Sequence, residues 1–268
     1  MSKITYNAVL RADYQYLFDT CIIKSEKYVT VDAVLNKILA GTIRYETVGH
    51  PLNIPWYFIG IIHYMEGSCN FKTHLHNGDP LTAKTIHVPS GRPPGGTAPY
   101  TWEFSAHDAL KLQMLDKWPD WDIPGILYKL EAYNGFGYRN LKQPIPSPYL
   151  WSFSNHYHSG KYVADGHYDA NAVSVQCGAA VLLRRFAEKQ LITTNIDRIA
   201  ITRQLAQKVV FSPQKYSIKA AQLQRWLVKS GAIIKIDGKV GRFTSDAYKE
   251  LTGEYLTGDP RSNVQVTP

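Results

Sequence analysis

The stretch Ile54-Pro-Trp-Tyr-Phe-Ile-Gly-Ile-Ile-His-Tyr-Met-Glu-Gly-Ser-Cys-Asn-Phe71 decides the predicted fold. Asn53 is suited to cap a helix, Pro55 fits its first turn, and Gly67 is expected to end it. Apolar residues recur between these ends at helical spacing, which predicts one buried stripe. The stripe consists of Ile54, Phe58, Ile61, Ile62 and Met65.

A single carboxylate, that of Glu66, lies in the last turn of this predicted helix. Apolar surroundings and the negative end of the helix both favour its protonated form. A carboxylic acid that stays protonated near neutral pH can donate its proton to a leaving oxygen. A lone glutamate at a helix end is more often only solvated, so a catalytic role needs support from the rest of the sequence.

Length and composition indicate a globular protein with one good-sized core and room for a small second domain, since the chain has 268 residues. Tyrosine is abundant, with 18 Tyr against 9 Phe, and tyrosine suits grooves that bind sugars. The net charge of +8 is dispersed, which argues against a basic nucleic-acid tail and indicates a general attraction to anionic surfaces. Nucleic acid fits this charge, and so does an acid-polymer-coated bacterial envelope.

Cysteine spacing and hydropathy exclude several classes of protein. The three cysteines are widely spaced, so they predict neither a disulfide framework nor a Cys-x-x-Cys metal pair. The chain starts without an apolar signal-peptide core and has no apolar run of membrane-spanning length. We therefore expect synthesis in the cytoplasm, no membrane insertion, and action at the cell wall only after release or dedicated export.

Helical patterns and turn signals predict a mainly α-helical chain with one small β-hairpin. The hairpin is expected at residues 72–88 around Asn77-Gly78, and the residues from Tyr149 to Asp169 are expected to form an ordered loop on one wall of a cleft. We expect two domains, residues 1–205 and 206–268, the second with a short disordered tail. The expected helices are 8–23, 30–40, 103–117, 123–134 and 172–189.

Two short motifs carry a resemblance to a known superfamily. Glu66-Gly-Ser68 ends an apolar helix before the predicted hairpin, and Glu131-Ala-Tyr-Asn-Gly135 ends a later helix. Together they resemble the lysozyme superfamily, in particular goose-type lysozymes and lytic transglycosylases. Residues 55–186 are more closely similar to a family of bacterial and phage lysozyme-like proteins. The sequence motifs of that family occur in this chain as Met65-Glu-Gly-Ser-Cys-Asn-Phe, His74-Leu-His-Asn-Gly-Asp-Pro-Leu, Ala132-Tyr-Asn-Gly and Lys161-Tyr-Val-Ala-Asp-Gly.

The C-terminal residues carry a second, independent resemblance. Leu223-Gln-Arg-Trp-Leu, Gly231, Asp237-Gly-x-x-Gly241 and Thr244 resemble a peptidoglycan-binding domain of the three-helix type. Both resemblances point to one polymer. They imply a lysozyme-like helical domain with a small β-hairpin, followed by a small three-helix module that binds the wall.

The first resemblance also implies roles for individual residues in cleavage of the peptidoglycan glycan strand. Glu66 would be the general acid that protonates the glycosidic oxygen. Ser68 would orient the acid or the sugar, and Tyr133 and Asn134 would contact the sugar or the acid. The motif Gly-Leu-Met-Gln, which follows this serine in the transglycosylases, is absent after Ser68, so the details of their substrate groove cannot be transferred to this chain. Hydrolysis and intramolecular transglycosylation both stay open.

The second carboxylate of the reaction is open. Asp79 stands at the hairpin tip, where many lysozymes carry theirs, but Asn77-Gly-Asp-Pro is also ordinary turn chemistry. Glu103 and Asp108 are alternatives.

Histidines raise a rival function, because Thr73-His-Leu-His76 places His74 and His76 on one face of a strand. Zinc peptidases and amidases use such ligands, but this spacing matches no strong zinc motif. We expect instead that His76 contacts substrate, that no metal or cofactor is needed, and that the protein is a monomer that binds peptidoglycan and no nucleic acid. A wall-binding protein without catalysis is the third alternative.

Overall fold

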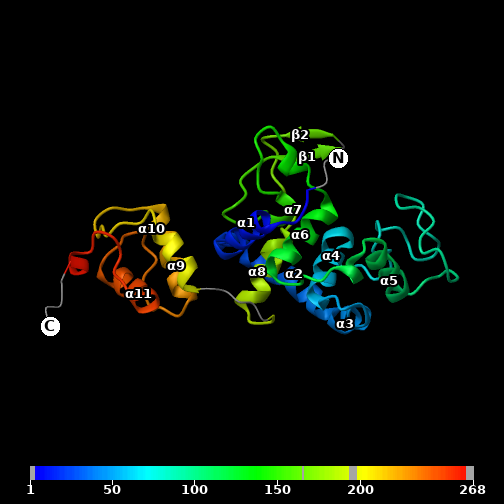
Figure 1. Cartoon of the computed structure of the whole chain (residues 1–268), viewed down its shortest axis with the longest axis horizontal. Helices are drawn as coiled ribbons and strands as arrows, with labels where there is room; N and C mark the ends of the chain where they lie inside the picture. Colours follow the sequence, from blue (N-terminus) through cyan, green and yellow to red (C-terminus); the bar gives the residue numbers. More distant parts are fainter. Residues whose placement is uncertain (1–3, 165, 193–197, 264–268) are drawn as a thin grey trace. The chain divides into compact units, whose positions relative to one another are not determined.

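The computed structural model describes residues 4–164, 166–192 and 198–263, and the chain forms two compact units, Met1–Thr194 and Asn195–Pro268 (Figure 1). Within the described residues the structure is mainly α-helical with one two-stranded antiparallel sheet, which confirms the predicted mainly-α class. None of the helices in those residues is long and apolar enough to cross a membrane.

The first unit is built from eight α-helices, four short 3-10 helices and two short strands in its described part. Local signals set several of their starts: the side chain of Asn7 caps α1 through the Leu10 N–H, and that of Asp122 caps α6 through the Gly125 N–H. The elements are α1 Ala8–Asp19, α2 Tyr28–Ala40, α3 Thr42–Gly49, α4 Trp56–Gly67, α5 Trp102–Leu112, α6 Ile123–Asn134, α7 Pro148–Trp151, β1 Lys161–Ala164, β2 His167–Asp169 and α8 Ala179–Glu188.

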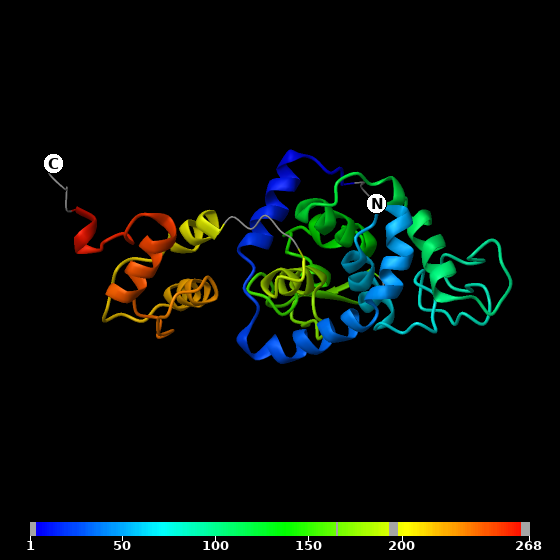
Figure 2. The ribbon, with the colours of Figure 1, turned by 90° about the horizontal axis from the view of Figure 1, so that it is seen from below.

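Helix α4 is the centre of this unit, because it packs against α2, α3, α6 and α8. All five residues of the predicted stripe are buried, and so is Ile59 outside the stripe. A helix buried on nearly all sides is apolar around its whole circumference, which explains the composition of the segment. Figure 2 shows the neighbouring helices gathered around α4 and the long loop between α4 and α5 extending to one side.

The ends of α4 differ from the predicted ones. Pro55 is the N-cap residue, whereas Asn53 lies earlier with a left-handed backbone (φ 55°). At the other end Gly67 is still helical, and Ser68 is the C-cap with φ 51°. The N–H groups of Ser68 and Cys69 donate to the carbonyls of Tyr64 and His63, at 2.9 Å and 3.1 Å, so the last turn is closed by residues after the glycine.

Gly60 allows the close approach of α2 to α4, and we expect Gly60→Ala to destabilise the first unit by about 1–3 kcal/mol. A Cβ at this position would lie 2.4 Å from Cγ2 of the buried Ile38, so the helices would have to move apart. Urea unfolding followed by tryptophan fluorescence measures this, since five of the six tryptophans lie in this unit. Gly95→Ala is the control, because a Cβ there meets nothing within 4 Å; equal stability of both variants would contradict the packing argument.

The regular hairpin lies at 161–169 and not at 72–88. Strands β1 and β2 pair antiparallel with Tyr162 opposite Tyr168, inside the stretch predicted as a loop. The predicted turn at Asn77-Gly78 does reverse the chain, but only one isolated bridge, Thr73 to Pro80, flanks it. Pro80 has no N–H for a ladder, and the Asp79 carboxylate binds backbone N–H groups further along the loop, so no second strand continues.

Helix α8 begins later than predicted, at Ala179, because the chain before it packs closely on α7. A Cβ at Gly178 would lie 2.2 Å from the Leu150 carbonyl oxygen. The side chain of Gln176 donates a 3.0 Å hydrogen bond to the carbonyl of Met65 near the end of α4. Helices α1 and α5 end earlier than predicted, at Asp19 and Leu112, and α3 occupies residues predicted as a loop.

The second unit contains three α-helices in its described part, α9 Arg198–Ala206, α10 Ile218–Lys229 and α11 Arg242–Thr252. The predicted boundary at residues 205 and 206 falls at the end of α9. Because α9 packs on α10 and α11, it belongs to the second unit, and the division lies after Thr194. The tail predicted as disordered includes residues 264–268, which lie outside the described residues. The core of this unit includes Leu223, Leu227, Val240, Tyr248 and Leu256.

Candidate active site

Glu66 stands at the end of α4 with its side chain open to solvent. The hydroxyl of Tyr149, in α7, donates a 2.9 Å hydrogen bond to its Oε1. Although the residue has substantial exposed surface, protein atoms flank much of the carboxylate, and this desolvation raises the pKa of Glu66 while the Tyr149 hydrogen bond opposes the rise. The exposed surface shows that a ligand can reach the group, and the raised pKa favours the protonated acid.

Two tyrosines from different helices lie close enough to Glu66 for its charge to affect them. Tyr133 is at the end of α6 and Tyr149 is in α7. Burial raises the pKa of both hydroxyls, and the negative charge of Glu66 raises them further. Both tyrosines therefore stay neutral near pH 7, and Tyr149 acts as a hydrogen-bond donor to the acid.

Tyr149 is the residue of this site that the sequence did not single out. It is the first residue of the Tyr-rich stretch predicted to form one wall of a cleft, so the composition gave a regional signal. Nothing in the local pattern distinguishes it from the other tyrosines there. Its contact with Glu66 joins residues 83 positions apart, which only the packing of α7 near the end of α4 brings together.

Removing the Tyr149 hydroxyl should raise the pKa of Glu66 further, because that hydroxyl stabilises the charged carboxylate. We expect Tyr149→Phe to shift the titration of the Glu66 side-chain carboxyl upward, as measured by carbon NMR on selectively labelled protein. Tyr133→Phe is the matched control, since Tyr133 has no hydrogen bond to Glu66 in the described structure, and it should shift the titration less. A lower pKa in Tyr149→Phe would contradict this assignment.

Ser68 and Asn134 occupy the ends of the two helices that bring Glu66 and Tyr133 together. Ser68 is the left-handed C-cap of α4, and Asn134 is the last residue of α6, followed by Gly135 with φ 87°. Both residues are exposed. Asn134 and Gly135 thus end α6, and the exposed side chains of Ser68 and Asn134 are accessible to a ligand.

The Asp79 carboxylate binds groups of its own loop. Oδ2 accepts hydrogen bonds from the N–H groups of Ile86 (2.8 Å) and His87 (3.0 Å) and from the Asn77 side chain, and Oδ1 lies 2.6 Å from Nδ1 of His87. The hydrogen bonds, that with His87 first, hold the pKa of Asp79 well below its usual range. The residue is only 6% exposed. This arrangement favours the turn interpretation of Asp79 over the role of a second catalytic carboxylate.

The two alternative carboxylates are also engaged. Glu103 pairs with Arg44, which lowers its pKa. Asp108 accepts from both Arg92 and His76, the latter at 2.8 Å. Among the described residues, both carboxylates are therefore bound to other side chains, and no recorded contact joins either of them to Glu66.

His74 and His76 join the loop before α5 to α5 itself. His74 lies 2.6 Å from the Ser105 hydroxyl and 2.8 Å from the Ala83 carbonyl. The His76 side chain has no exposed surface, and burial lowers its pKa, so it is placed to hold Asp108 rather than to contact substrate as predicted. The described residues contain no group of three or more His, Cys, Asp or Glu side chains that could hold a metal ion.

Glu131, the acid of the second motif, is a buried structural residue with 1% exposure. The Tyr14 hydroxyl and Nε of Arg139, the latter at 2.9 Å, both donate to its Oε2. It thereby connects α6 to α1.

Comparisons with family models, curated protein sequences and solved structures found no match to this chain. Evidence for a function therefore comes from the residues around Glu66 and from the surface of the second unit.

Proposed function

We propose that the first unit cleaves the glycan strand of bacterial peptidoglycan, with Glu66 as the general acid, and that the second unit binds the cell wall. The observation that carries the proposal is a solvent-accessible carboxyl with a raised pKa, flanked by two tyrosine hydroxyls. Such a group keeps its proton to a higher pH than an ordinary glutamate does, and it can protonate a glycosidic oxygen. The proposal includes the lysozyme-like fold and the resemblance to goose-type lysozymes and lytic transglycosylases.

The contacts of Glu66 suggest how its proton would move. The protonated carboxyl donates to the oxygen that leaves as the bond between two amino sugars breaks, and positive charge develops on the sugar carbon. The reaction is completed when water (hydrolysis) or a hydroxyl of the same sugar (transglycosylation) bonds to that carbon and gives its proton back to Glu66. The Tyr149 hydroxyl then stabilises the carboxylate left behind through the hydrogen bond to Oε1. Tyr133 and Asn134 lie at the end of α6 and Ser68 at the end of α4, and they would contact the sugar.

The second unit would act by tethering. Binding of the wall by one unit raises the local concentration of glycan strands at the other, without any change in the active site. The net charge of +8 would add attraction to the anionic envelope, and this part should weaken as salt concentration rises. The protein would work as a monomer at the cell wall, after release or export from the cytoplasm.

Digestion of purified peptidoglycan with identification of the products by mass spectrometry tests the proposal. New reducing ends would show hydrolysis, and anhydro-sugar ends would show transglycosylation; the Glu66→Gln variant should produce neither. Cut peptides that disappear with a chelator would instead indicate a metallopeptidase. Binding to the wall without any product would leave a wall-binding protein, and both of these results would overturn the proposed cleavage.

A further inference from the structure

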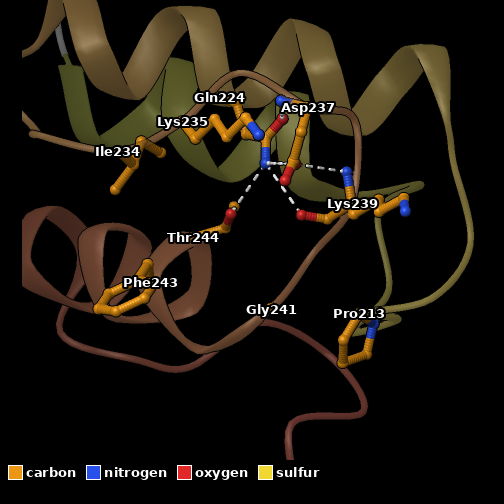
Figure 3. Close-up of a pocket in the computed structure, with 9 residues that line it drawn as sticks. All are labelled: Pro213, Gln224, Ile234, Lys235, Asp237, Lys239, Gly241, Phe243 and Thr244. Carbon is orange, nitrogen blue, oxygen red and sulfur yellow. Dashed lines mark hydrogen bonds between the residues drawn. The ribbon is translucent and has the colours of Figure 1, made fainter.

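The second unit has an open pocket between the loop after α10 and the start of α11 (Figure 3). Its lining combines apolar and charged side chains. Phe243 is 81% exposed despite its size, and Ile233, beside the lining residue Ile234, is fully exposed. Within the pocket, Phe243 therefore offers an exposed aromatic face and Ile234 a half-buried apolar side chain that a ligand can cover. The lining residues are Pro213, Gln224, Ile234, Lys235, Asp237, Lys239, Gly241, Phe243 and Thr244.

Gln224 fixes the shape of this pocket. Its side chain is 1% exposed, and its Nε2, which carries two hydrogens, lies within hydrogen-bond distance of Oδ1 of Asp237 (2.9 Å), the Lys239 carbonyl (2.9 Å) and the Thr244 hydroxyl (3.0 Å), as Figure 3 shows. Its Oε1 accepts from the N–H of Gly238 at 2.7 Å. The wall is thus held before any ligand arrives, which lowers the entropy lost on binding.

The same hydrogen bonds determine which groups are left for a ligand. The polar atoms of Gln224 and Thr244 already bind each other, and Oδ1 of Asp237 also accepts from the N–H of Lys239 at 2.9 Å. Two exposed lysines, Lys235 and Lys239, line the pocket together with the Asp237 carboxylate. The hydrogen bond from Gln224 first, and also the charge of Lys235, lower the pKa of Asp237, so this carboxylate is ionised. This set suits carboxylates beside small apolar groups, with one place for an amino group.

We propose that this pocket binds the stem peptide of peptidoglycan rather than its sugar strand, an inference that rests on the proposed wall-binding function. The stem peptide carries free carboxylates for Lys235 and Lys239, alanine methyl groups for Phe243 and Ile234, and often a diamino acid whose ammonium would meet Asp237. A neutral sugar strand offers hydroxyl and amide groups, and the side chains best suited to pair with them, Gln224 and Thr244, are already engaged.

Isothermal titration of the full-length protein with synthetic L-Ala-γ-D-Glu-meso-diaminopimelate tests the proposal. We expect binding that weakens by about tenfold or more in Lys235→Ala/Lys239→Ala. Lys208→Ala/Lys219→Ala is the charge-matched control, because both lysines are exposed in the same unit and line no part of the pocket. It should keep the wild-type affinity. Phe243→Ala, a change at an exposed side chain, should also weaken binding.

The alternative ligands are titrated in parallel. Binding of a chitin tetrasaccharide without binding of the peptide would overturn the proposal and leave glycan cleavage by Glu66 untouched. Tighter binding of a glycerol-phosphate oligomer through the two lysines would overturn it in favour of an anionic wall polymer, as would equal losses in the two double-lysine variants. Peptide binding that depends on Lys235 and Lys239, in a protein that releases no products from peptidoglycan, would support the pocket assignment and overturn the proposed cleavage.

Discussion

Replacing Glu66 with glutamine should lower the rate of glycan cleavage by about 10²- to 10⁴-fold. Glutamine keeps the shape of the side chain, and its amide oxygen can still accept the hydrogen bond from Tyr149. It has no acidic proton to donate to the leaving oxygen. The rate of appearance of new sugar ends from purified peptidoglycan measures the loss.

The fold should survive this change, because Glu66 is exposed and glutamine has nearly the same size and shape. Glu46→Gln, an exposed glutamate of α3, is the matched control and should keep full activity. Unchanged hydrogen exchange in α4 would show that a loss of rate is chemical. Full activity in Glu66→Gln would move the search for the acid elsewhere.

The pH dependence of the wild-type rate follows from the same residue. Desolvation raises the pKa of Glu66 above the ordinary 4.5, so the acid form persists to higher pH. Because only the protonated form donates, the rate should fall as pH rises through this raised pKa. The residual rate of Glu66→Gln should not show this fall. A limb at the ordinary glutamate pKa would contradict the desolvated site.

The sequence predicted the helices that depend on local signals. Helix α6 starts and ends where predicted, because Asp122 caps it, Pro124 fits its first turn and Gly135 with φ 87° follows its end. The stripe of α4 was predicted because helical periodicity reads directly onto one face. The three-helix description of the second unit came from the resemblance and not from local signals, and no helix was predicted at α9.

Tertiary contacts decided what the sequence could not predict. Asn77-Gly78 has the residues of a hairpin turn, but the hydrogen bonds of Asp79 to the later loop replace the second strand. For the candidate site, the position of Glu66 at the end of an apolar helix could be predicted from the sequence. Its partner Tyr149 was not, since the contact depends on where α7 packs.

Arg139→Met should destabilise the first unit by about 3–5 kcal/mol, because it leaves a buried carboxylate without its cation. Nε of Arg139 donates to Glu131, and its NH1 donates to Asp13 at 3.0 Å, so one guanidinium links α6 and the following turn to α1. Lys117→Met is the control: Lys117 is exposed and pairs with Asp116 at 3.5 Å, and its loss should change stability by less than about 1 kcal/mol. Urea unfolding followed by tryptophan fluorescence measures both.

The loss in Arg139→Met should grow as pH rises, which separates the charge from packing. Burial already raises the pKa of Glu131, and Arg139 opposes that rise, so removing Arg139 raises the folded-state pKa further. At low pH Glu131 is neutral in both the folded and the unfolded state, and the missing cation matters little. As pH rises above the pKa that Glu131 has in the unfolded state, the unfolded state loses its proton first, and the variant loses stability until the raised folded-state pKa is passed.

Adding Glu131→Gln to Arg139→Met removes the buried charge and keeps an acceptor for Tyr14. The double variant should regain part of the stability at neutral pH and lose this pH dependence. A loss that is equal at every pH would mean that Arg139 stabilises the unit by packing on Tyr14 alone.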